Sequence, residues 1–126
     1  MFKRIDHVEI VPSDYERSIA FYTEVFGFTV RERVPVGNPP LREIVFLELG
    51  GTVLELLDLE EPAEAVLPGP RVGYRMMAIE VDNIDDALAY LTGKGVEVSR
   101  ASYPSAGGWR AEVLDPDGLA IEIRQW

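Results

Sequence analysis

The 126-residue sequence contains no cysteine and a single histidine, His7. The absence of cysteine excludes disulfide bonds, thiolate metal sites and cysteine nucleophiles. Any imidazole ligand or base must therefore be His7. Basic residues are also scarce, because 12 Lys and Arg stand against 22 Asp and Glu and leave a formal net charge of −10. A charge of this sign repels a phosphate backbone, so nucleic acid is not an expected partner.

Long hydrophobic runs are absent as well. None reaches the roughly 20 residues that cross a bilayer, and acidic residues interrupt the N-terminal segment where a signal peptide needs a continuous apolar stretch. We therefore expect a cytoplasmic protein with no membrane partner. The hydrophobic fraction of 47% and the charged fraction of 27% are typical of globular proteins. The length suits one domain, which we place at residues 1–126.

An internal repeat organises the sequence. The segment HVEIVPSDYERSIAFYTEVFGFTV, which starts at His7, resembles MMAIEVDNIDDALAYLTGKGVEV, which starts at Met76. Each copy predicts a strand, a helix and a second strand, and a hairpin with a glycine-containing turn follows it. We therefore predict an α+β fold of two tandem βαβββ modules. Module 1 covers about residues 1–60, a proline-rich linker about 61–70 and module 2 about 71–126.

Cap and stop signals set the expected boundaries of the helices. Ser13-Asp14 supplies an N-cap for the first helix, and Ser13 has the capping-box spacing to Glu16. Asp82-Asn83 supplies the N-cap of the second helix, and Asn83 has a weaker version of the same spacing to Asp86. Glycines follow both helices, at Gly27 in the first copy and at Gly93 and Gly95 in the second. Short strands are predicted at 28–30 and 96–98, each followed by a loop that contains proline or glycine.

One helix covers only one face of each sheet, so the other face is expected to form a cupped groove in a mixed β-sheet. Strand alternation assigns four repeat-related side chains to that inward face: His7, Glu55, Met76 and Glu122. Glu9 has the same parity as His7, and we interpret it as an exposed strand end.

The inward carboxylates stand between apolar strand neighbours, where a bare anion is costly to bury. They need a cation or a proton. Two carboxylates and one imidazole suit a divalent ion such as Zn, Ni, Co, Mn or Fe, which predicts a metal site of His7, Glu55 and Glu122. The alternatives are a strand histidine hydrogen-bonded to a nearby carboxylate, and groove carboxylates that remain solvated.

Four segments carry a family resemblance: IDHVEIVPSDYERSIAFYTEVFGF, LGGTVLELLD, AIEVDNIDDALAYLTGKGVEV and LDPDGLAIEI. Together they resemble the vicinal oxygen chelate superfamily of glyoxalases, bleomycin resistance proteins and dioxygenases. The resemblance implies a metal held by one residue from each of four inward strands, here His7, Glu55, Met76 and Glu122. Many members carry histidine at the third position, whereas this chain has a methionine, which is a soft and weak ligand. With one histidine, the two-histidine facial triad of oxygenases cannot form.

The resemblance implies an enzyme, a metal-assisted isomerase or lyase acting on a substrate with adjacent oxygens through an enediolate-like intermediate. Glu122 or Glu55 would be the general base. Homodimers are common in the family, and the groove forms either within one chain or across a swapped dimer. The alternative is a metal-free protein that binds and sequesters an antibiotic or drug, and the net negative charge favours a cationic small-molecule ligand over anionic coenzyme A thioesters. The expected pocket residues are Met76, Trp109, Val53 and Leu57.

Overall fold

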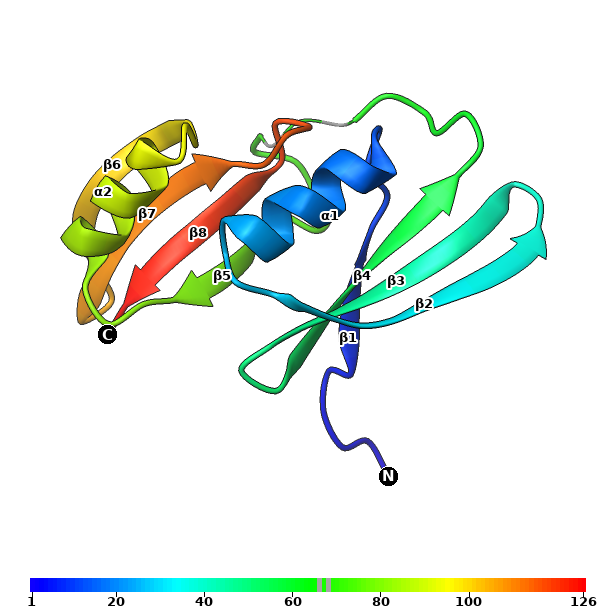
Figure 1. The fold of residues 1–126 in the computed structure, drawn as a ribbon. Helices are drawn as coiled ribbons and strands as arrows, with labels where there is room; N and C mark the ends of the chain where they lie inside the picture. Colours follow the sequence, from blue (N-terminus) through cyan, green and yellow to red (C-terminus); the bar gives the residue numbers. More distant parts are fainter. Residues whose placement is uncertain (66, 68) are drawn as a thin grey trace. The chain divides into compact units, whose positions relative to one another are not determined.

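The structure, a computed structural model, describes residues 1–65, 67 and 69–126. Two compact units, Met1–Glu64 and Ala65–Trp126, each contain one of the two modules (Figure 1). In the predicted linker, residues 66 and 68 lie outside the described residues. The groove expected from the sequence stays a prediction.

Unit 1 is a four-stranded sheet with one helix. Its elements are β1 (His7–Ile10), α1 (Tyr15–Glu24), β2 (Thr29–Asn38), β3 (Leu41–Leu49) and β4 (Thr52–Leu59). The strand order is β1-β4-β3-β2, with β1 parallel to β4 and the other pairs antiparallel. Helix α1 contacts β4.

Unit 2 repeats this arrangement. Its elements are β5 (Met77–Glu80), α2 (Ile84–Gly93), β6 (Val98–Ser105), β7 (Gly108–Leu114) and β8 (Ala120–Gln125). The strand order is β5-β8-β7-β6, with β5 parallel to β8, and α2 contacts β6, β7 and β8 (Figure 1). The two tandem βαβββ modules predicted from the sequence are confirmed.

Apolar side chains that alternate along the central strands form the core of each unit. In unit 1 they include Val45, Leu47 and Leu56, which are fully buried, and in unit 2 Val113, Ile121 and Ile123, which are buried to the same degree or nearly so. Burying each such side chain stabilises the fold by roughly 1.5–3 kcal/mol. Because alternate residues face opposite sides of a strand, this pattern leaves Glu55 and Glu122 on the other face of their sheets.

Both helices begin at an acidic or amide cap. Asp14 caps α1, since its side chain accepts a hydrogen bond from the Arg17 N–H at 3.0 Å, so the capping box that begins at Ser13 is wrong by one residue. The predicted cap of α2 is confirmed, because the Asn83 side chain accepts a hydrogen bond from the Asp86 N–H at 2.9 Å. Gly27 and Gly95 follow the helices with φ of 77° and 78°, values that favour glycine.

The strands that follow the helices are longer than predicted. Strand β2 continues through Pro35 and Gly37, and β6 continues through Pro104, where the sequence indicated loops. Both strands lie at the edge of a sheet, and an edge strand tolerates proline because one side of it donates no ladder hydrogen bond. The pairing shifts register between Pro35 and Asn38 and between Arg100 and Tyr103.

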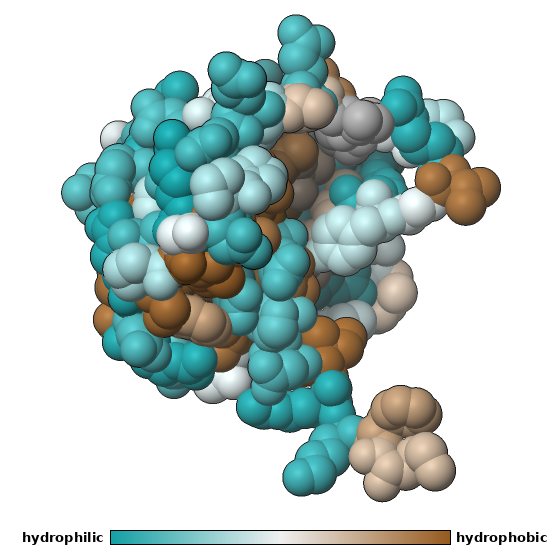
Figure 2. All heavy atoms as spheres, turned by 90° about the vertical axis from the view of Figure 1, so that its right-hand side faces the viewer, coloured by the Kyte–Doolittle hydropathy of each residue, from teal (hydrophilic) through white to brown (hydrophobic). Residues whose placement is uncertain are grey.

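The surface agrees with the acidic composition. Hydrophilic residues cover most of the face drawn in Figure 2, and hydrophobic residues appear there as separate patches. Among the residues that the structure describes, no helix is long and apolar enough to cross a membrane.

Candidate metal centre

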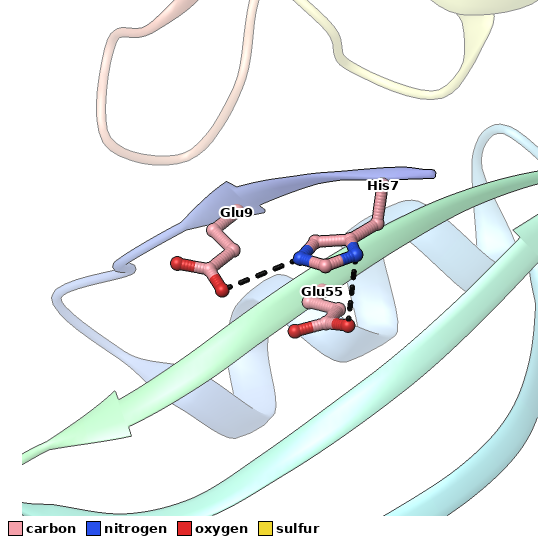
Figure 3. A group of neighbouring side chains, drawn as sticks. All are labelled: His7, Glu9 and Glu55. Carbon is pink, nitrogen blue, oxygen red and sulfur yellow. Dashed lines mark ion pairs between the residues drawn. The ribbon is translucent and has the colours of Figure 1, made fainter. Parts of the chain in front are cut away.

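Parallel pairing of β1 with β4 brings three potential ligands to one face of the unit 1 sheet. The register sets His7 opposite Val53 and Glu9 opposite Glu55. Paired residues of neighbouring strands share a face, and so do residues two apart on one strand. The side chains of His7, Glu9 and Glu55 therefore point to the same side, and Figure 3 shows the imidazole ring beside both carboxylates. The sequence segment HVEI dictates this, because its apolar residues Val8 and Ile10 take the opposite parity.

The three side chains are close enough to share one ion. Nδ1 of His7 lies 3.5 Å from Oε1 of Glu55, and Nε2 lies 3.4 Å from Oε1 of Glu9 (Figure 3). One donor atom from each residue falls within 4.8 Å of the other two. The side chain of Glu55 is only 8% exposed, whereas that of His7 is 33% and that of Glu9 53% exposed. The cluster thus runs from a buried carboxylate to one in contact with solvent.

A fourth side chain orients the imidazole. Nδ1 of His7 lies 3.1 Å from Oδ2 of Asp6. This hydrogen bond is the main cause that raises the pKa of His7 above its ordinary value, and the negative charge of Glu55 adds to it. The same hydrogen bond lowers the pKa of Asp6. When Nδ1 donates to Asp6, Nε2 keeps its lone pair, which is the state that a metal-binding histidine needs.

The charge of the cluster is unbalanced. Among the described residues, no lysine or arginine forms an ion pair with Glu9 or Glu55, and His7 is their one ion-pair partner. Burial raises the pKa of the Glu55 carboxyl, while the positive charge of a protonated His7 opposes that effect. Two carboxylates and one imidazole, which binds a metal in its neutral form, are a donor set that suits a divalent cation. The residues present therefore fit such an ion.

The equivalent face of unit 2 has a different composition. Its parallel register places Glu122 opposite Ala78, as Glu55 lies opposite Glu9 in unit 1, so Met76 occupies the position of His7. Oε2 of Glu122 lies 2.9 Å from Nη2 of Arg110, which also contacts Oε1 of Glu112 at 2.8 Å. The carboxylates of this face are thus matched by guanidinium groups of the protein.

Comparison with known proteins identifies the family. The model of the Glyoxalase/Bleomycin resistance protein/Dioxygenase superfamily matches residues 4–123. The chain belongs to this superfamily. Human mitochondrial methylmalonyl-CoA epimerase is 35% identical over 97% of this chain and 73% of its own length. Lactoylglutathione lyase of Salmonella typhimurium is 32% identical over 95% of this chain and 90% of its own length.

A similar solved structure is named for a different role. TnmS3, an antibiotic-binding protein from Streptomyces, aligns with a TM-score of 0.77 and 25% identity over 98% of this chain and 96% of its own. Proteins that resemble this chain thus include two named as enzymes and one named as an antibiotic-binding protein.

Two of the three metal ligands predicted from the sequence lie together in the structure. His7 and Glu55 meet in unit 1, and Glu122 lies on β8 of unit 2, where it contacts Arg110. The role of Glu122 as ligand or base stays a prediction.

The four predicted pocket residues lie in different surroundings. Val53 and Leu57 are half-buried and share the β4 face of Glu55. Met76 is half-buried, with its Sδ 4.0 Å from Nη2 of Arg110. Trp109 pairs with Gln125 on β8 and takes the parity of Ala111, the opposite face from Glu122. Their part in a pocket stays a prediction.

Sequence reasoning missed the contacts of three residues. Glu9 is exposed, as expected for a strand end, but it also contacts His7, and the i, i+2 spacing in HVE was the signal. Arg110 and Glu112 were not recognised. Their alternation in WRAEV places both on the face of the unit 2 sheet that carries Glu122, where the β7–β8 register sets Glu112 opposite Glu122.

Proposed function

We propose that the protein is a divalent-metal-dependent isomerase or lyase that moves a proton at a carbon next to a carbonyl group. The observation that carries the proposal is the buried carboxylate of Glu55, which has a single imidazole as its ion-pair partner. Two relatives, the epimerase and the lyase, support the reaction class through their names.

His7 and Glu55 would hold the ion, with Glu122 as a further ligand or as the base. Zn, Ni, Co, Mn and Fe all suit nitrogen and carboxylate donors, and this chain has no thiolate to favour a softer metal. A bound ion would supply Lewis acid chemistry, stabilising negative charge on two adjacent substrate oxygens. The half-buried Val53 and Leu57 flank Glu55 on β4 and would exclude water from its carboxylate.

The general base must accept a proton from carbon. Glu122 suits this role because its ion pair with Arg110 fixes the orientation of the carboxylate. Glu55 is the other candidate, because it is the buried acid of the cluster. The small-molecule substrate carries the two oxygens, and a homodimer is the proposed assembly.

Proton transfer is tested by solvent exchange. The full-length protein is stripped with a chelator, reloaded with Ni²⁺ or Zn²⁺, and incubated in D₂O with lactoylglutathione or methylmalonyl-CoA while NMR follows the proton next to the carbonyl. We expect metal-dependent deuterium incorporation that Glu122→Gln reduces by about 10²–10⁴-fold, the usual contribution of a general base. Protein that cannot be loaded with a divalent ion would overturn the proposal.

A second candidate function is sequestration of an antibiotic or drug without metal. The likeness to TnmS3 and the methionine at position 76 favour it. A thermal-shift screen separates the two functions, because a protein is stabilised by what binds its folded state. Stabilisation by divalent ions supports the enzyme, whereas stabilisation by cationic aromatic drugs with no metal effect supports sequestration.

A further inference from the structure

Glu9 is the carboxylate beside Nε2 of His7. Nδ1 lies 3.1 Å from Oδ2 of Asp6 and 3.5 Å from Oε1 of Glu55, and when the proton is on Nδ1, Nε2 has the lone pair. Oε1 of Glu9 lies 3.4 Å from that atom. A lone pair and a carboxylate oxygen this close repel each other unless a proton or a cation lies between them.

The electrostatics of unit 1 point to a cation at this position. Glu55 is more than nine-tenths buried, and its carboxylate makes no hydrogen bond to another described residue. A proton on His7 balances one of the two charges of Glu9 and Glu55, so one negative charge remains. A divalent ion balances both and leaves the imidazole neutral, as ligation requires.

We propose that Glu9 is a metal ligand, so that the protein donors of the ion are one imidazole nitrogen of His7 and the carboxylates of Glu9 and Glu55. All three come from β1 and β4 of unit 1. This inference rests on the proposed function in one respect, the presence of a divalent ion. Glu9 thereby takes the ligand role that the family resemblance implied for Met76. Glu122 then remains available for proton transfer.

The geometry requires only a small adjustment. Two donors that are each about 2.1 Å from an ion lie at most about 4.2 Å apart, and the widest separation in the cluster is 4.8 Å or less. The side chain of Glu55 is only 8% exposed, whereas that of Glu9 is 53% exposed and has more room to move. We therefore expect Glu9 to be the side chain that moves to bring the donor atoms within about 4.2 Å of one another.

Unit 2 offers no such set. The residues equivalent to His7 and Glu9 are Met76 and Ala78, which supply a thioether and a methyl group. A thioether is a poor partner for a hard divalent ion. Only unit 1 has the imidazole and two carboxylates in equivalent positions.

The test is Co²⁺ titration of the chelator-treated full-length protein, followed by calorimetry and by the visible absorption of the bound ion. Glu9→Gln and Glu9→Ala are compared with Met76→Leu and with Glu97→Gln, which removes the same charge at an exposed position of unit 2. We expect both Glu9 variants to weaken Co²⁺ binding about tenfold or more and to change its absorption spectrum. Met76→Leu and Glu97→Gln should bind within twofold of the parent chain.

Each other outcome is decisive. If His7→Ala and Glu55→Gln lose Co²⁺ while both Glu9 variants keep parental affinity and spectrum, Glu9 is not a ligand and the proposed function stands. Loss of binding in Met76→Leu would likewise overturn the role of Glu9. A parent chain that binds no Co²⁺ would overturn both proposals. Circular dichroism of each variant in chelator verifies that it is folded.

Discussion

The two sheets carry a glutamate at the same place but neutralise it differently. Glu55 on β4 and Glu122 on β8 occupy equivalent register positions. Glu55 faces the imidazole of His7 at 3.5 Å, whereas Glu122 faces the guanidinium of Arg110 at 2.9 Å and that of Arg124 at 3.9 Å. The same backbone therefore supports two electrostatic environments.

The charge balance of unit 2 does not depend on pH or on a bound ion. Its counter-charges are guanidinium groups, which stay protonated, so the face that carries Glu122 is balanced at any pH where carboxylates are ionised. In unit 1 the balance changes with the protonation of one histidine or with a bound cation. Unit 1 is therefore the half of the molecule whose stability should respond to metal and pH.

The largest expected effect is that of metal on unit 1. Divalent ion at about 100 times its dissociation constant should raise the Tm by roughly 10 °C in a chain of this size. His7→Ala should abolish the increase, and Met76→Ala should keep it. Differential scanning calorimetry with Ni²⁺ or with chelator measures both. An equal increase in His7→Ala would show that the ion binds elsewhere.

Removal of the Arg110 guanidinium from unit 2 should lower the free energy of unfolding by nearly as much as metal binding raises it. Arg110→Ala removes the guanidinium shared by Glu112 and Glu122. It leaves them the longer contacts to Arg75 at 3.3 Å and Arg124 at 3.9 Å. A broken, largely buried ion pair of this kind should cost about 2 kcal/mol of unfolding free energy. Urea unfolding measures the loss, with the exposed Arg17→Ala as control. An unchanged midpoint for Arg110→Ala would mean that unit 2 does not need its internal cation.

Removal of the Glu55 charge in unit 1 should increase the free energy of unfolding, the opposite of the effect of Arg110→Ala. Because burial raises the pKa of Glu55, the folded chain binds its proton more tightly than the unfolded chain, and stability falls as pH rises above the ordinary value of 4.5. In chelator, Glu55→Gln should therefore stabilise the protein by about 1 kcal/mol at pH 8. The gain should disappear below pH 4.5. Urea unfolding at several pH values measures it, and a variant less stable than the parent at pH 8 contradicts it.

The smallest effect concerns the β6–β7 turn of unit 2. Ala106 and Gly107 have φ of 50° and 80°, and a two-residue turn of this kind favours asparagine over alanine at its first position. Ala106→Asn should stabilise the protein by about 0.5 kcal/mol without changing metal binding. Hydrogen exchange should place the added protection in β6 and β7 and leave unit 1 unchanged. Equal added protection in both units would contradict a local effect at this turn.

The repeat and strand alternation were sufficient to predict the fold and to place His7 and Glu55 on one face. Both predictions rest on the periodicity of apolar and polar residues along each segment, which can be read directly from the sequence. The Arg110–Glu122 pair depends on the exact β7–β8 register, because a one-residue shift would reverse the face of every side chain. The predicted cap Ser13-Asp14 includes the observed cap Asp14, but the capping box was placed one residue early because Ser13 is an equally good cap by type. The length of β2 was missed because proline indicates a loop unless the strand is known to be an edge.

The prolines in β2 and β6 have a consequence for self-association. Pro35 and Pro104 interrupt the outer row of backbone amides on these two strands, and register shifts bend the strands nearby. An incoming strand from another molecule would find no regular ladder to extend. These two borders thus protect the chain against fibril growth, and assembly through them would have to rely on side chains.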